Sequence, residues 1–155
     1  MKTLYESILS STRSGKSAIT SWLDEYGIKN YTLNAKGEID VDGNVDLSSK
    51  GLTEFPSYIQ FRTVKGNFFC DLNRLTSLKG APIEVGKVFD CSYNRLVSLE
   101  GAPLRVKYFD CSSNKLTSLE GAPRKSNFFN CKNNTTKFSK GDVMKVCNVE
   151  KDIYV

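Results

Sequence analysis

The sequence predicts an α/β repeat fold, a short solenoid in which successive coils of the chain stack on one another. The first observation is three near-copies of one segment, at residues 68–82, 89–103 and 109–123. The second is a cysteine that recurs 21, 20 and 20 residues apart: Cys70, Cys91, Cys111 and Cys131. A fixed period of about 20 residues is typical of a solenoid, whose repeats bury their apolar faces only against their neighbours. Such a fold presents a long surface, so we expect a binding function.

The composition favours a soluble protein without catalytic chemistry. The 155 residues suffice for one domain, and no apolar run approaches the roughly 18 residues that a membrane helix needs. The opening segment is too polar for a signal peptide, so we expect a cytoplasmic protein in a reducing compartment. The chain has no histidine, the commonest general base and metal ligand. We therefore expect no enzyme, no metal and no cofactor.

The first segment, residues 1–16, is predicted to be an extension of the folded domain. Apolar residues on one face of a short helix precede a polar linker at residues 10–16: Leu4, Tyr5, Ile8 and Leu9. Two interpretations remain open, a frayed terminus or a docking peptide that presents this face to a partner. Residues 14–17 resemble the end of a phosphate-binding loop, but Ser10 stands where that loop needs a glycine, so no nucleotide is expected.

Residues 17–44 are predicted to cap the solenoid, because its first repeat would otherwise expose an apolar end. Ser17 can begin a helix that ends at Gly27. One side of that helix is apolar and includes the single tryptophan: Ile19, Trp22, Leu23 and Tyr26. Alternating apolar residues over 31–47, interrupted by turn sequences, predict a β-hairpin that leads into the first repeat strand.

The repeats are predicted over residues 45–139, with the unit Val-x-x-Phe-x-Cys-x-x-Asn-x-Leu-x-x-Leu-x-Gly-Ala-Pro. Phenylalanine and cysteine, two residues apart, point to one side of a strand and into the core, so the cysteines are expected to be packed and inert. The asparagine amides can bond the backbone of their own turn and of the next coil: Asn73, Asn94 and Asn114. Gly-Ala-Pro favours an extended, non-helical return segment.

The second end of the solenoid is predicted to be covered by residues 140–155. A short helix at 140–147 is expected to turn three side chains inward: Val143, Val146 and Cys147. Residues 152–155 can add a last strand. The whole chain is therefore expected to form one solenoid with a cap at each end.

The repeat unit resembles the leucine-rich repeat, whose strand has the pattern L-x-x-L-x-L-x-x-N-x-L. The short period and extended return are similar to the bacterial type, and the Gly-Ala-Pro variant to repeat proteins of bacteria and tailed phages. The resemblance covers residues 45–139 and implies parallel strands on a concave face. Residues 1–9 also resemble a prefix of otherwise unrelated gut-phage proteins. The resemblance is specific for fold and implies little about function.

Strand residues that point away from the core are expected to form columns on that concave face. These columns are acidic and aromatic, although the net charge of the chain is +5. Asp90 and Asp110 are expected about 4.8 Å apart on neighbouring strands. Aromatic residues beside carboxylates suit a partly basic protein partner; a second interpretation is that aspartate keeps an exposed sheet soluble. The candidate partner-binding residues are Asp46, Phe69, Asp71, Val88, Asp90, Tyr108, Asp110, Phe128 and Asn130.

Three functions follow from these features. The favoured one is a non-catalytic protein-interaction module that binds an unidentified protein through the concave face. The first alternative is a structural or virion-packaged component recruited through residues 1–16. The second is weak nucleic-acid binding through a basic edge, Arg74, Arg95 and Lys115. Nucleic acid is the less favoured partner, because no block of five like charges occurs in the chain.

Overall fold

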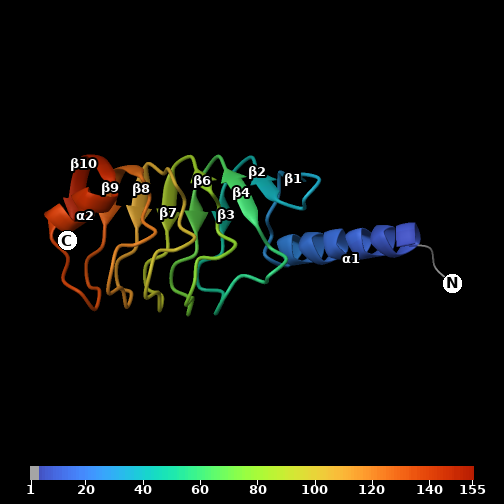
Figure 1. Cartoon of the computed structure of the whole chain (residues 1–155), viewed down its shortest axis with the longest axis horizontal. Helices are drawn as coiled ribbons and strands as arrows, with labels where there is room; N and C mark the ends of the chain where they lie inside the picture. The colour runs from blue at the N-terminus through green and yellow to red at the C-terminus, as the bar shows by residue number, and fades with distance from the viewer. Residues whose placement is uncertain (1–3) are drawn as a thin grey trace.

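The repeats form successive coils that stack side by side along the long axis of the molecule (Figure 1). The computed structural model describes residues 4–155, with residues 4–13 described by their backbone alone. It is a parallel-strand β-solenoid of about five turns with few helices, which confirms the predicted solenoid. Each coil is too narrow to bury its own apolar residues, so the core forms between coils.

A six-stranded parallel sheet collects one strand from each repeat and from the C-terminal cap. Its order is β10-β9-β8-β7-β5-β3, so neighbours in space are successive repeats. The register places equivalent repeat positions side by side, with Phe89 between Phe68 and Phe109. The strands are β3 (Val45–Asp46), β5 (Phe68–Phe69), β7 (Val88–Asp90), β8 (Tyr108–Asp110), β9 (Lys125–Asn130) and β10 (Asn148–Tyr154).

A second sheet is formed by the residues that precede the first sheet in each coil. Its order is β1-β2-β4-β6, with the antiparallel hairpin β1–β2 at one edge and parallel pairs beyond it. Isolated bridges from Glu84 to Arg105 and from Arg105 to Lys125 extend it toward the C-terminal coils. The strands are β1 (Tyr31–Leu33), β2 (Ile39–Val41), β4 (Phe61–Val64) and β6 (Glu84–Val85). The sequence analysis predicted the hairpin but not this sheet.

The connection between the two sheets requires a close approach of neighbouring coils. Gly86 lies in this connection, and a Cβ built there would lie 2.0 Å from the carbonyl oxygen of Lys65. Because that oxygen belongs to the backbone of the preceding coil, no side chain fits without separating the coils. The extra residue that lengthens this repeat to 21 is therefore a glycine.

The core consists of the predicted columns of phenylalanine, cysteine and leucine. The rings of Phe68, Phe89, Phe109 and Phe129 are fully buried. Successive ring centroids lie 5.4, 5.7 and 5.1 Å apart, so each ring packs against those of the neighbouring coils. The four repeat cysteines are also buried. Burial of one such aromatic side chain contributes about 1.5–3 kcal/mol relative to exposure.

Buried asparagines join the coils by hydrogen bonds. The Asn94 amide nitrogen donates to the carbonyl oxygens of Cys70 at 2.9 Å and Cys91 at 3.1 Å, and its oxygen accepts from the Leu75 amide at 2.9 Å. Two of these partners, Cys70 and Leu75, lie in the preceding coil, so the prediction that the amides bond the next coil was wrong in direction. The same arrangement recurs at Asn73, Asn114 and the unpredicted Asn134. Each amide therefore satisfies backbone groups of two coils.

The N-terminal cap differs from its prediction in one respect. Helix α1 (Leu4–Glu25) is continuous, so residues 10–16 are not a linker and Ser17 is not the start of a helix. Adding residues to an existing helix costs far less than beginning one, so the packed C-terminal part can support polar turns before it. Trp22 and Leu23 are buried, and the Trp22 ring lies 6.4 Å from that of Phe61. The predicted helix end at Gly27 is confirmed by its left-handed φ of 67°.

The N-terminal part of α1 extends away from the coils, along the long axis (Figure 1). The predicted apolar face lies outside the side chains that the structure describes; it comprises Leu4, Tyr5, Ile8 and Leu9. The backbone from Leu4 onward is continuous with the rest of α1, so the described part of residues 1–16 is not separated from the cap by a linker.

The C-terminal cap consists of helix α2 (Lys140–Val146) and strand β10. Ser139 begins α2 with a reciprocal pair of hydrogen bonds to Asp142, whose pKa is lowered to about 2 by the bonds from Ser139 and by Lys145. Val143 and Cys147 are buried as predicted, but Val146 is 39% exposed. The helix has only two turns, and its end places Val146 on the solvent side. The predicted last strand is confirmed and is longer than expected.

Candidate interaction surface

The outer side of the six-stranded sheet, called the strand face, brings the predicted partner-binding residues together. The register aligns Val88 with Tyr108 and Tyr108 with Phe128. A second column runs beside it: Asp46, Phe69, Asp90, Asp110 and Asn130. Asp46 is exposed and the other members are half-buried, as is Asp71 after strand β5. All nine predicted residues therefore lie on one continuous surface.

The acidic column also has a local structural task. The Asp90 Oδ1 atom accepts a hydrogen bond of 2.9 Å from the backbone nitrogen of Ser92. In four members of the column, a side-chain oxygen accepts this hydrogen bond from the backbone nitrogen two residues later: Asp46, Asp90, Asp110 and Asn130. Asn130 performs this task with a neutral amide. Phe69 occupies the same position after β5 and offers no such acceptor. The turn after a strand therefore uses a side-chain oxygen at four of the five positions, and a negative charge is not required.

The charges on this column are partly desolvated and lie close to one another. Burial raises the pKa of Asp90, and the negative charges of Asp110 and Asp71 raise it further, against the lowering effect of the Ser92 hydrogen bonds. Burial likewise raises the pKa of Asp71. At the C-terminal end, the Asn130 amide donates to Asp110 Oδ2 at 2.8 Å. Like charges directly opposite on neighbouring strands destabilise a sheet.

The aromatic column provides half-buried rings next to these carboxylates. The Tyr108 and Phe128 ring centroids lie 5.8 Å apart, and the Lys151 ammonium lies 5.4 Å from the centre of the Phe128 ring. Burial, together with the charge of Asp110, raises the pKa of Tyr108. The column therefore offers flat apolar area beside acidic groups.

Two exposed residues at the end of the strand face were missed by the sequence analysis. Leu72 is 54% exposed and Tyr93 is 59% exposed, and they occupy equivalent positions of successive repeats. Both have left-handed backbone conformations, with φ of 54° and 51°. Large side chains are uncommon in this conformation. The sequence signal was available: the residue before each repeat asparagine is large in two repeats, where a turn favours Gly or Asn.

The predicted basic edge is exposed on the turn that follows the strand face. Arg74, Arg95 and Lys115 occupy equivalent positions, and each donates its backbone N–H to the preceding coil. None of the three forms an ion pair with a described acid. The side chains are therefore free cations on a rim, but they are spaced along one line and no aromatic side chain is interleaved with them.

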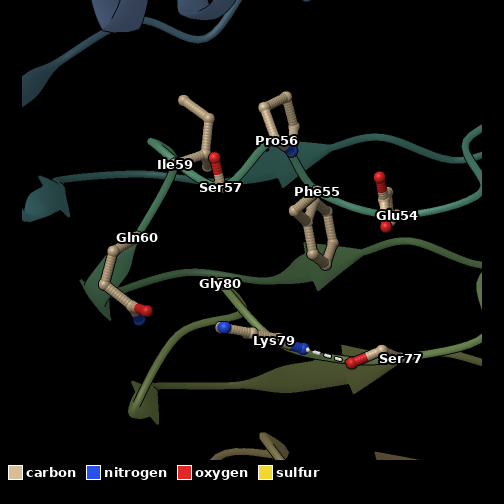
Figure 2. A pocket seen from close by; sticks show the side chains of 9 residues that line it. All are labelled: Glu54, Phe55, Pro56, Ser57, Ile59, Gln60, Ser77, Lys79 and Gly80. Carbon is tan, nitrogen blue, oxygen red and sulfur yellow. Dashed lines mark hydrogen bonds between the residues drawn. The ribbon is translucent and has the colours of Figure 1, made fainter. Parts of the chain in front are cut away.

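A hollow of about 190 Å³ lies at the return turns of the first repeats (Figure 2). Figure 2 shows Glu54 and Lys79 among the residues that line it, with the Lys79 backbone nitrogen donating to the Ser77 hydroxyl at 3.1 Å. A neighbouring hollow of about 410 Å³ shares Gln60, Lys79 and Gly80 and continues along the Gly-Ala-Pro turns. Gly80 has a φ of 96°, and a Cβ there would lie 2.7 Å from the Ile59 carbonyl oxygen. The second hollow thus lies where the glycines of successive return turns stack on one another.

The described cysteines are buried, and burial changes their acidity. Burial raises the pKa of Cys70, Cys91 and Cys111 well above the ordinary value and that of Cys147 to about 11. A thiol with a raised pKa is a poor nucleophile. Among the described residues, no group of three or more histidine, cysteine or acidic side chains could hold a metal ion. No described helix is long and apolar enough to cross a membrane.

Comparisons with known proteins leave the surface as the main guide to function. No protein-family model, no curated protein and no solved structure matches the chain.

Proposed function

We propose that the chain is a non-catalytic protein-interaction module whose strand face binds a partner surface with exposed basic groups. The observation that favours this proposal is the use of aspartate where asparagine suffices. After β5, Phe69 offers no acceptor, and after β9, Asn130 supplies the turn acceptor without charge. Asp90 and Asp110 supply it with two neighbouring negative charges, which disfavour the folded state. Residues that lower the stability of the fold without a structural need are typical of binding sites.

Aromatic residues strengthen the proposal, because they surround the carboxylates on the same face. Tyr108 and Phe128 are half-buried beside the acidic column, and Tyr93 is exposed at its end. Tyrosine and arginine are enriched among the residues that dominate protein interfaces. A partner with arginine or lysine side chains could contact the carboxylates while its stems pack on these rings. The chemistry of the surface therefore favours a basic partner over an acidic one.

The proposal extends to the type of repeat. The buried asparagine amides, the phenylalanine and cysteine columns and the extended return segments support a leucine-rich repeat of the Gly-Ala-Pro variant. In that case the strand face corresponds to the concave face, on which such repeats commonly bind proteins. The proposal of a binding function rests on the charges and rings of this face and does not depend on the repeat type.

Capture of partners from the native source tests the proposal. The bait variant Asp90→Asn with Asp110→Asn keeps the turn acceptors and removes two charges. The matched control, Glu100→Gln with Glu120→Gln, changes the net charge equally at exposed residues of the return turns. We expect the aspartate variant to lose at least tenfold in the yield of a specific partner, and the glutamate control to retain it.

The aromatic residues provide a second variant. Tyr108→Ala should also weaken capture, because the ring supplies apolar contact area beside Asp110. Equal recovery of the same partner by the wild type, the aspartate variant and Tyr108→Ala would exclude the strand face as the binding site. A partner that is identified should then bind the purified wild type with a measurable Kd.

A structural or packaged component recruited through residues 1–16 remains the second candidate. The observation in its favour is that α1 extends beyond the end of the coils (Figure 1). Removal of residues 1–16 from the full chain separates the two candidates. If the shortened chain loses its partner while the strand-face variants keep theirs, the helix is the recruiting element. Retained capture by the shortened chain favours the strand face.

A further inference from the structure

The second sheet has two parts that differ in how their charges are arranged. In the N-terminal part, cations lie beside anions of the neighbouring strand. The Arg62 guanidinium forms an ion pair with Asp40, which lowers the pKa of that carboxyl together with the Thr63 hydrogen bond. The next pair, Lys65 and Asp42, is 3.0 Å apart. Opposite charges at neighbouring positions are the arrangement that stabilises a sheet.

In the C-terminal part and in the connections that follow it, five exposed cations gather, and four of them form no ion pair with a described acid. They are called the basic patch and comprise Lys87, Arg105, Lys107, Arg124 and Lys125. Arg105 is the direct register neighbour of Lys125, and the Lys107 backbone nitrogen donates to the Lys87 carbonyl oxygen at 3.0 Å. Arg105 therefore stands next to Lys125, and Lys107 next to Lys87, so cations are neighbours at both positions.

Within the described residues, one member of the basic patch forms an ion pair. Lys125 contacts Glu150 of β10 at 2.7 Å. Glu84 lies beside Arg105 in the register but forms no ion pair with it. The remaining four cations have no acidic group within 4.0 Å among the residues that the structure describes. The same sheet holds ion pairs in its N-terminal coils, at Arg62 with Asp40 and Lys65 with Asp42. The lack of ion pairs in the basic patch therefore follows from its residue types and not from the geometry of the sheet.

The residue types of the basic patch select the class of partner. Three of the five are lysines, which are depleted at protein–protein interfaces. Between the outward cations lie the buried Val85, Val106 and Ser126, so the centre of the patch has no exposed aromatic anchor. Interfaces with nucleic acid are more polar and more positively charged than those with protein. Cations also recur from coil to coil at about 4.8 Å, on a surface along which an extended chain of phosphates can lie.

We propose that the basic patch binds the phosphate backbone of a nucleic acid. Lys87, Arg105, Lys107, Arg124 and Lys125 each contact a phosphate, and no base is read. The acidic column of the strand face repels phosphates, so the nucleic acid lies on the second sheet and leaves the strand face free. This function is independent of the proposed protein interaction and uses different residues.

Fluorescence anisotropy with a labelled single-stranded 20-nucleotide DNA and the matching duplex tests the proposal. With four to five phosphate contacts on a single strand, log K should fall with log salt with a slope of about −3. Raising the salt from about 50 to about 200 mM should therefore weaken binding roughly 60-fold. No binding to either probe at the lower salt concentration, or a flat salt response, overturns the proposal.

Two matched triple variants locate the site. Lys87→Gln, Arg105→Gln and Lys107→Gln remove three charges from the basic patch, and Arg74→Gln, Arg95→Gln and Lys115→Gln remove three from the basic edge. Both lower the net charge from +5 by the same amount. We expect the patch variant to bind DNA at least tenfold more weakly, with the slope of log K against log salt less steep by about 2. The affinity of the edge variant should change less than threefold.

Further measurements decide between this proposal and its alternatives. Equal losses in the two triple variants, or a loss in the edge variant alone, overturn the assignment to the basic patch. Ile83 and Leu104 are exposed next to the patch, so anionic vesicles and poly-glutamate are compared with the DNA probes. Binding to vesicles or poly-glutamate without binding to DNA also overturns it. The strand-face variant Asp90→Asn with Asp110→Asn should bind DNA as well as the wild type or better, whether or not it loses a protein partner.

Discussion

The strand face and the basic patch are built from the same coils, yet each concentrates charge of one sign. On the strand face, Asp90 stands beside Asp110, and on the second sheet Arg105 stands beside Lys125. The N-terminal part of the second sheet shows that the same backbone accommodates opposite charges, as in Arg62 with Asp40. The comparison teaches that the solenoid fixes where side chains stand, whereas it leaves the sign of their charge free to vary.

The largest expected effect separates the core from the strand face at two adjacent residues. Phe129 is fully buried, whereas Phe128 is half-buried on the strand face. Phe129→Ala should lower the free energy of unfolding by about 3–5 kcal/mol, because it leaves a cavity between coils. Phe128→Ala should lower it by about 1 kcal/mol or less and weaken partner capture. Urea denaturation of both variants measures the difference; similar losses would mean that Phe128 serves the core.

The asparagine ladder should be the next most sensitive element, and it supports both faces. Asn94→Ala leaves the Leu75 N–H without its side-chain partner in the interior, whereas the Cys70 carbonyl keeps its hydrogen bond from Asn73. Each buried group without a partner costs about 1–3 kcal/mol. We expect a loss of about 1–3 kcal/mol in the free energy of unfolding, measured by thermal or urea denaturation. The exposed neighbour Arg95→Ala is the control and should change the stability by less than about 0.5 kcal/mol.

The solenoid was predictable because its core allows few residue types. Phenylalanine and cysteine at fixed spacing must point inward, and the register of the strand face follows from side-chain alternation. The C-terminal part of the second sheet was not predictable, because each of its coils contributes a single buried apolar residue at most, such as Val85 or Val106. A single apolar residue gives no alternation to detect.

The same reasoning explains what was missed outside the core. The cations of the basic patch come from three repeats and are up to 18 residues apart between neighbouring members, so no charge block marks them. The turn positions of Leu72 and Tyr93 were missed because these residue types do not favour a left-handed backbone. The continuity of α1 was missed because Ser10 to Ser14 have weak helix propensity.

A smaller effect tests the electrostatics of the strand face through pH. Because the pKa of Asp90 is raised in the folded protein, protonation of Asp90 favours folding. Its stabilising contribution is complete below the ordinary pKa of 3.8 and is lost as the pH rises through the raised value. Asp90→Asn should therefore be more stable than the wild type at about pH 7, and the difference should shrink toward about pH 3.5.

NMR titration of the Asp90 carboxyl checks the premise of this prediction. The resonance should titrate above the ordinary value, whereas that of Asp142, which has its pKa lowered to about 2, should titrate below it. A stability difference between Asp90→Asn and the wild type that is independent of pH would show that the charge of Asp90 does not act on folding.

The most direct test of the central claim is the free energy of unfolding of Asp90→Asn with Asp110→Asn at neutral pH. The claim is that these charges serve binding and oppose folding. Because asparagine retains the turn acceptors, the variant should be more stable than the wild type by about 0.5–1 kcal/mol. The control Glu100→Gln with Glu120→Gln should stay within about 0.5 kcal/mol of the wild type. A double aspartate variant less stable than the wild type would contradict the claim and assign these charges to the fold.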